Sequence, residues 1–255
     1  AMDGQKPLVQ LFVRQSVYDP DANGYCPFCQ KWFMLLHLLM EKGYLSFKLT
    51  PVNLAIPLPS YEQLNVGRRL PVLTVSDDWE NAPIIVVDTD EEIESLFIKW
   101  NIDQSLVSVS SVDSMCKHCL FTHGFGLKTG DRFIKGEEPC YSDCNLGPKL
   151  HHVRIAGEFY RNYSIPNEFY YIWTYLANVY QLDSFKMSCP SDKDILVHLL
   201  DKVTPASSCE LNEIQAKIMM MPDAMKTLTL PPNVEPKVLP PFTSILDTTK
   251  SHPTC

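Results

Sequence analysis

Two cysteines separated by two residues, Cys26 and Cys29, are the residues whose types and spacing can do redox chemistry in this sequence. An apolar run at 8–13 predicts a strand before them. The run after them predicts a helix from about Pro27 to Lys42, ended by Gly43. Cys26 would then start a helix, where unpaired N–H groups and the helix dipole stabilise a thiolate. A thiolate attacks disulfides, and Cys29, one turn on, is placed to resolve the mixed disulfide.

The alternatives for this pair are zinc binding or two inert structural thiols. The strand-then-helix context favours redox chemistry over a zinc knuckle. A second group, Cys116, Cys119 and His123, has zinc-like spacing, and Cys140 and Cys144 lie downstream. Scattered reduced thiols explain that group equally simply, because no second ligand pair is well spaced. We therefore expect no metal.

Composition and charge exclude several classes of protein. With 255 residues, 45% of them hydrophobic, the chain can form one large domain or two small ones. Its formal net charge of -8 argues against a nucleic-acid partner. The first residues lack a secretory apolar segment, so we expect a cytoplasmic protein. No apolar run reaches the roughly 18 residues of a membrane helix, and the nearest, 32–40, predicts a buried helix.

The remaining pattern defines the elements that must position the cysteines. Strands are predicted at 47–52, 69–75 and 83–88, and a helix from Thr89 to about Trp100. The resulting order, β-α-β-(α)-β-β-α, is the thioredoxin-like layout. In that fold a cis proline precedes the third strand, which assigns this role to Pro71. Further helices are predicted at 143–156, 169–180 and 191–202, and residues 204–255, rich in proline, are predicted to be a disordered tail.

Several short motifs resemble the chloride intracellular channel (CLIC) family. The second half carries most of them, as Asp143-Cys144-Asn145-Leu146, Pro148-Lys149-Leu150-His151, Tyr160-Arg161-Asn162-Tyr163 and Cys189-Pro190-Ser191-Asp192-Lys193. The first half agrees through Cys26-Pro27-Phe28, Phe33-Met34 and Thr89-Asp90. The divergence resembles that of an invertebrate member.

The resemblance implies a glutathione-transferase fold: a thioredoxin-like α/β domain at 7–100 and an all-helical domain at 101–203. It implies a cytoplasmic protein that associates conditionally with membrane lipid, through the segment from Cys26 to about Asn53, and supports anion transport. It also implies glutathione-dependent thiol chemistry. Cys26 matches the reactive cysteine, Pro71 the cis proline, and Thr89-Asp90 the place that holds the γ-glutamyl end. The candidate glutathione site comprises Cys26, Pro27, Phe28, Leu70, Pro71, Thr89 and Asp90.

Three departures from the family pattern stand out. Cys29 replaces a common serine, which permits a dithiol mechanism. Cys140 stands where a Ser or Thr normally caps the helix that contains Asp143. Cysteine is a poor helix cap, and the replacement is expected to cost about 1 kcal/mol of stability. The segment 101–132 is too short for the two long helices of the family, so the helical domain is expected to be shortened.

Three functions therefore remain open from the sequence. The first is a CLIC-like protein that supports anion transport. The second is a glutaredoxin-like oxidoreductase that uses Cys26 and Cys29 as catalytic residues. The third is a non-catalytic scaffold or regulatory protein, with protein partners bound through the C-terminal tail.

Overall fold

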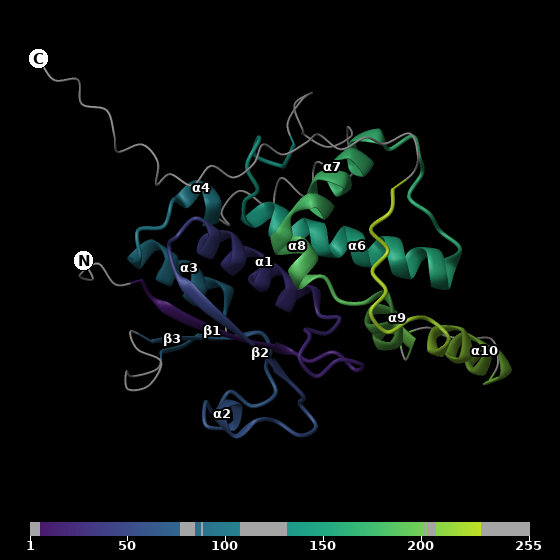
Figure 1. Ribbon diagram of the computed structural model, residues 1–255, viewed down its shortest axis with the longest axis horizontal. Coiled ribbons are helices and arrows are strands. Elements are labelled where there is room, and N and C mark those ends of the chain that lie inside the picture. Colours follow the sequence, from purple (N-terminus) through teal and green to yellow (C-terminus); the bar gives the residue numbers. More distant parts are fainter. Residues whose placement is uncertain are drawn as a thin grey trace, which may run out of the picture.

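The computed structural model of the protein describes residues 6–76, 85–87, 89–107, 132–200, 202 and 208–230 (Figure 1). A four-stranded sheet and the helices that pack on it form the first half. A group of helices forms the second half.

The sheet has the strand order β2-β1-β3-β4. Its strands are β1 (Leu8–Arg14), β2 (Ser46–Val52), β3 (Val72–Ser76) and β4 (Ile85–Val87). β1 runs parallel to β2 and antiparallel to β3, and β3 runs antiparallel to β4. Alternate side chains of β1 point to opposite faces of the sheet. Val9, Leu11 and Val13 join the main core, whereas Phe12 joins a small cluster with Tyr61.

The first helix, α1 (Pro27–Glu41), lies between the sheet and the second half of the chain (Figure 1). It is buried on nearly all sides, as the apolar run predicted, and it packs against α6 and α8. Its C-cap is Lys42, and Gly43 follows with a φ of 79°, a conformation that suits glycine. The short helix α2 (Pro59–Glu62) lies on the other side of the sheet, and α3 (Asp90–Lys99) follows β4 (Figure 1).

The second half is helical, as predicted. It comprises α4 (Gln104–Val107), α6 (Tyr141–Arg161), α7 (Tyr170–Gln181), α8 (Asp183–Ser188), α9 (Asp192–Leu200) and α10 (Ser208–Met219). Buried residues of both halves belong to one main hydrophobic cluster. That cluster includes Trp32 and Phe33 from α1 and Tyr175 and Phe185 from the helical part. Burying such aromatic side chains between the two halves stabilises their contact.

The predicted disordered tail at 204–255 is wrong for residues 208–230. Residues 208–219 form α10, whose Ile218 is fully buried against Ile155 and Leu196. The chain then returns along α9, where the Asp192 N–H donates to the Met225 carbonyl at 2.8 Å. The high proline content of residues 204–255 indicated disorder, and no sequence pattern indicated the apolar and polar contacts that hold residues 208–230. Residues 231–255 lie outside the described residues.

Cys140 is the N-cap of α6, as the sequence predicted, and Asp143 compensates for its weak capping. The Asp143 carboxylate accepts hydrogen bonds from the Cys140 N–H at 2.9 Å and from the Cys140 thiol at 3.2 Å. It also accepts one from the Ile134 N–H at 3.0 Å. The buried carboxylate therefore joins the helix start to the preceding loop.

The predicted shortening of the helical domain falls mainly outside the described residues. Between α3 and Arg132 the structure describes the four-residue helix α4 and the turn before it. Residues 108–131, including the Cys116, Cys119 and His123 group, lie outside the described part of the chain. The domain boundaries at residues 100 and 203 remain predictions.

Candidate thiol site

Cys26 occupies the N-cap of α1, with Pro27 in the first turn. The Cys26 carbonyl accepts the first helical hydrogen bond, from the Gln30 N–H at 3.0 Å. Its thiol is half-buried. The pKa of this thiol is lowered to about 6. The main cause is a hydrogen bond from the Cys29 side chain. N–H groups of Cys29 and Phe28 and the charge of Arg14 add to it, against the effect of burial.

The loop before Cys26 doubles back onto β1. Gly24 donates its N–H to the Arg14 carbonyl at 2.6 Å, and a Cβ at Gly24 would meet the Gln15 carbonyl oxygen at 2.5 Å. Only glycine allows so close an approach. The guanidinium of Arg14 consequently lies 5.4 Å from the ring centre of Tyr25, next to Cys26. The fold therefore places a positive charge beside the reactive thiol.

Cys29 is fully buried, and burial raises the pKa of its thiol well above the ordinary value. The two cysteines thus have opposite roles at neutral pH: Cys26 is a thiolate and Cys29 is a protonated donor. Burial also raises the pKa of Cys140, Cys144 and Cys189. Among these described cysteines, Cys26 alone combines partial exposure with a lowered pKa.

The peptide bond between Leu70 and Pro71 is cis, which confirms the prediction for Pro71. Both residues line a cavity of about 340 Å³. Phe28, two residues after Cys26, lines the same cavity and is 53% exposed. The structure therefore brings together Phe28, Leu70 and Pro71 from the predicted glutathione site. Cys26 and Pro27 precede this wall on the chain and are not among its lining residues.

Thr89 and Asp90 form the start of α3. Thr89 is its N-cap, and its hydroxyl accepts a hydrogen bond from the Glu92 N–H at 3.3 Å. Asp90 is the first helical residue, and its side chain lies outside the described part of the structure. Ile93, one turn further along α3, lines the cavity beside Phe28. Thr89 and Asp90 thus start the helix whose residue Ile93 lines the cavity.

Sequence reasoning did not place Trp32 and Ile93 at this site. Together with Arg68 and Arg69, which precede Leu70 of the predicted site, they complete the cavity wall. Trp32 lies four residues after Phe28, on the same face of α1, so helical spacing was an available signal. On the other side of the site, His198 of α9 stacks on Tyr25 with ring centres 3.4 Å apart. No sequence pattern linked these two rings, because they lie 173 positions apart in the chain.

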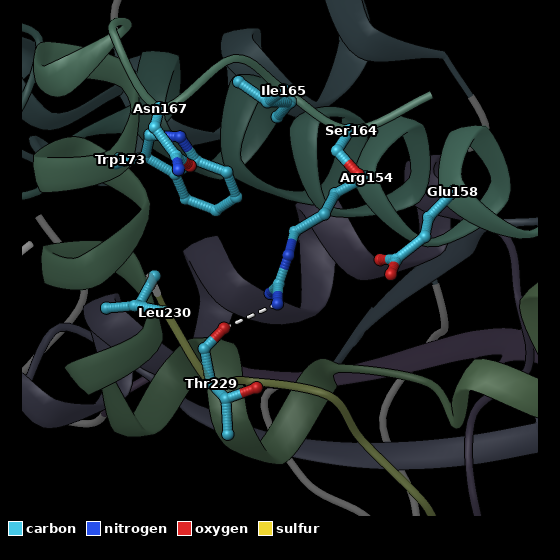
Figure 2. A pocket seen from close by; sticks show the side chains of 8 residues that line it. All are labelled: Arg154, Glu158, Ser164, Ile165, Asn167, Trp173, Thr229 and Leu230. Atoms are coloured by element: carbon cyan, nitrogen blue, oxygen red, sulfur yellow. Dashed lines mark hydrogen bonds between the residues drawn. The ribbon is translucent and has the colours of Figure 1, made fainter. Parts of the chain in front are cut away.

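A second cavity, of about 230 Å³, lies in the helical part between α6 and the C-terminal segment (Figure 2). Arg154 is 92% buried and points into it, together with Trp173 and Glu158. The Arg154 guanidinium donates to the carbonyl oxygens of Thr227 at 2.9 Å and Thr229 at 2.5 Å. These bonds attach residues 227–229 to α6.

Within the described residues, no group of three His, Cys, Asp or Glu side chains could hold a metal ion. The same residues contain no helix long and apolar enough to cross a membrane.

Comparison with solved structures defines the class of protein as one with the glutathione-transferase fold. The crystal structure of the CLIC homologue EXC-4 from Caenorhabditis elegans matches with a TM-score of 0.63 and 22% identity, over 89% of this chain and 94% of that chain. A dehydroascorbate reductase from Chlamydomonas reinhardtii matches with a TM-score of 0.56 and 17% identity, over 76% of this chain and 98% of that one. A thioredoxin-like domain followed by a helical domain is therefore confirmed.

Sequence comparisons identify the family. Residues 7–102 match the family model of the CLIC-like N-terminal domain. The chloride intracellular channel Clic of Drosophila melanogaster is 29% identical over 210 residues, 75% of this chain and 81% of the relative. The channel exc-4 of Caenorhabditis elegans is 26% identical over 238 residues, 78% and 81% of the two chains. The chain is therefore a chloride intracellular channel-like protein, with a CLIC-like N-terminal domain and similarity to these channels over most of its length.

Proposed function

We propose that this protein catalyses glutathione-dependent thiol–disulfide exchange with Cys26 as the nucleophile. One observation carries the proposal: the half-buried Cys26 thiol, at the start of α1, has a pKa lowered to about 6. Such a thiol is largely deprotonated at neutral pH, and the thiolate is the attacking species.

The reaction consists of two exchange steps. The Cys26 thiolate attacks one sulfur of a substrate disulfide, a new S–S bond forms, and the other substrate sulfur leaves as a thiolate. Glutathione then attacks the mixed disulfide, which releases the Cys26 thiolate and leaves glutathione joined to the remaining half of the substrate. Exchange with a second glutathione frees that half as a thiol and forms oxidised glutathione. Cys29 offers a dithiol route, because its thiol already donates to Cys26. Loss of the Cys29 proton, whose pKa is raised by burial, would limit that route.

Glutathione is the proposed co-substrate, held by Cys26, Pro27, Phe28, Leu70, Pro71, Thr89 and Asp90. The cis peptide bond at Pro71 and the cavity walls from Phe28 and Leu70 support this assignment. Thr89 and Asp90 contribute through the start of α3, where helix N–H groups favour a carboxylate. The family supports glutathione binding in general, and these residues are our specific proposal.

Reduction of bis(2-hydroxyethyl) disulfide by glutathione, coupled to NADPH through glutathione reductase, tests the proposal. We expect measurable turnover that falls to background in Cys26→Ser and persists in Cys29→Ser, because glutathione can resolve the mixed disulfide. The matched control is Cys209→Ser, which removes an exposed thiol on α10. Equal turnover in the protein and in Cys26→Ser would contradict the proposed function.

Conditional membrane association with anion transport is the second candidate, for a protein otherwise located in the cytoplasm. The observation that favours it is the apolar stretch of α1, which buries residues 32–36 within the fold. This helix of 15 residues spans about 22 Å at 1.5 Å per residue, less than the roughly 30 Å of a bilayer core. Association through the segment from Cys26 to Asn53 therefore requires α1 to leave the core and the chain around it to rearrange.

Sedimentation with anionic liposomes at pH 7.4 and pH 5, with and without oxidant, tests this candidate. We expect a larger membrane-bound fraction under acid or oxidising conditions, accompanied by chloride efflux from loaded vesicles. A protein that stays in the supernatant under all these conditions would exclude membrane association. Partner binding through the C-terminal tail would then be examined as the basis of a scaffold function.

A further inference from the structure

The cavity beside the thiol site has a positive wall, although the chain has a formal net charge of -8. Arg68 and Arg69 line the cavity, and none of its described lining residues is acidic. The Lys149 ammonium, which is not among the lining residues, lies 5.7 Å from the ring centre of Phe28. A ligand that enters therefore meets cations and aromatic rings.

The loop that carries the arginines is held in place by local contacts. Asn65 and Gly67 have φ values of 54° and 68°, so the chain turns tightly before Arg68. The Tyr61 hydroxyl donates a hydrogen bond to the Arg69 carbonyl oxygen, and the cis bond to Pro71 follows. Tyr61 is itself buried against Phe12 of the sheet. The position of Arg68 at the cavity is thus set by the fold.

Arg68 is exposed, and it makes no hydrogen bond or ion pair with any described residue. Its guanidinium can therefore pair with a ligand without first breaking a bond to those residues. Guanidinium groups bind carboxylates through two parallel hydrogen bonds. The volume of about 340 Å³ is that of a site for a small molecule.

We propose that this cavity selects small disulfides that carry carboxylates, and that Arg68 is the residue that recognises the negative charge. The inference rests on the proposed thiol function of Cys26 and adds the class of disulfide that the site accepts. Arg68 acts in substrate binding: it attracts the anionic disulfide, while the Cys26 thiolate attacks the sulfur and the second substrate thiolate departs.

Three disulfide probes of different charge test the selectivity. Dithiobis(nitrobenzoate) carries two carboxylates, bis(2-hydroxyethyl) disulfide is neutral, and cystamine carries two ammonium groups. The second-order rate constant for modification of Cys26 is measured for each by mass spectrometry of its peptide, because other thiols react as well. The proteins compared are the unmodified chain, Arg68→Gln and Arg161→Gln. Arg161 is an exposed arginine in the last turn of α6, so its variant makes the same charge change away from the cavity.

In Arg68→Gln we expect the ratio of the anionic rate constant to the cationic one to fall by roughly three- to tenfold, as removal of one nearby charge predicts. The rate constant for the neutral probe should change little, and Arg161→Gln should keep the original ratio. High salt should reduce the difference between the unmodified chain and Arg68→Gln, because exposed charges are screened.

Two outcomes would overturn the inference. An unchanged ratio in Arg68→Gln, with normal reaction of Cys26 with the neutral probe, would refute charge selection by Arg68 and leave the thiol function intact. No reaction of Cys26 with any of the three probes would refute the thiol function and the inference together. Circular dichroism and thermal unfolding of Arg68→Gln confirm that the variant is folded.

Discussion

At the scale of single residues, the two cysteines of one motif have different chemistry because their surroundings differ. Cys26 is half-buried at the helix start, whereas Cys29 lies one turn inside the helix and is fully buried. The hydrogen bond from the Cys29 side chain to Cys26 is the main reason for the low pKa of Cys26. Sequence spacing predicted the pair and the position of Cys26 at the helix start, and the structure adds that burial raises the pKa of Cys29 alone above its ordinary value.

Replacement of Cys29 by Ala should raise the pKa of Cys26 from about 6 toward the ordinary thiol value, because the hydrogen bond that stabilises the thiolate is lost. Cys29→Ser is the matched control: its hydroxyl can still donate, so a lowered pKa should persist. The pH dependence of iodoacetamide alkylation of Cys26 measures both. An unchanged profile in Cys29→Ala would contradict the assigned cause.

At the scale of elements, the start of α6 depends on one buried carboxylate. Asp143 accepts hydrogen bonds from the Ile134 N–H, the Cys140 N–H and the Cys140 thiol. Burial raises the pKa of Asp143, and the hydrogen bonds from those N–H groups oppose this shift. The carboxylate of Asp143 therefore stabilises the start of α6 more than the Cys140 thiol at its N-cap does.

Asp143→Ala should lower the free energy of unfolding by about 2–4 kcal/mol, because two backbone N–H groups lose their acceptor. Cys140→Ala removes only the thiol donor and should cost under about 1 kcal/mol. Urea unfolding followed by circular dichroism compares the two variants. Equal losses would show that the carboxylate does not have the larger role.

A second element-scale prediction concerns the segment that follows α10. Arg154→Met keeps an unbranched side chain beside Trp173 and removes the donors to Thr227 and Thr229. The backbone amides of residues 225–230 should then exchange hydrogen for deuterium faster. Glu158→Gln changes a residue of the same cavity that makes no hydrogen bond to the described part of the segment, and it should leave the exchange unchanged. Unaltered protection in Arg154→Met would show that the segment is held by other contacts.

At the scale of the whole molecule, α9 contacts both halves of the chain. Its Asp194 carboxylate accepts hydrogen bonds from the Ser16 hydroxyl at 2.6 Å and the Val17 N–H at 2.8 Å, in the loop that leads to Cys26. His198 stacks on Tyr25. The Asp192 carboxylate accepts from the Thr227 N–H at 3.0 Å. One short helix thus connects the thiol loop with the C-terminal segment.

Two neighbouring histidines of α6, the buried His151 and the half-buried His152, make the stability of the whole molecule depend on pH. Burial lowers the pKa of His151 to about 3 and that of His152 to about 4. The unfolded chain binds protons at both near pH 6.5, so their contribution to stability is present above that pH and is lost as the pH falls toward the folded values. Asp143 and Asp192, whose pKa values burial raises, act in the opposite direction.

We expect the free energy of unfolding to fall between pH 7 and pH 5, by roughly 1–2 kcal/mol for each histidine. His151→Gln should make this dependence shallower, because one of the two groups no longer titrates. Urea unfolding at pH 7, 6 and 5 compares the slopes of the two proteins, so a lower overall stability of the variant does not affect the test. Equal slopes would contradict the role assigned to His151.

The sequence by itself determined the local features of this protein. The apolar periodicity of β1 and α1, the cysteine spacing and the proline before β3 are local patterns, and the family motifs confirmed the fold that they indicated. The helix start at Cys26 could be predicted because a cap and the helix dipole depend only on neighbouring residues. The position of Cys140 at the cap of α6 was predicted from the family pattern, because the local pattern placed the helix start only at Asp143.

Only the tertiary structure decided which groups surround the thiol. Arg14 and His198 approach the site from β1 and α9, and no local pattern relates positions so far apart. The same reason explains the incorrect tail prediction: proline content indicated disorder, whereas Arg154 and Asp192, on other helices, hold residues 225–229. Long-range hydrogen bonds and burial form only when the chain folds, and they determined the more distant surroundings of the Cys26 thiol and the ordered part of the tail.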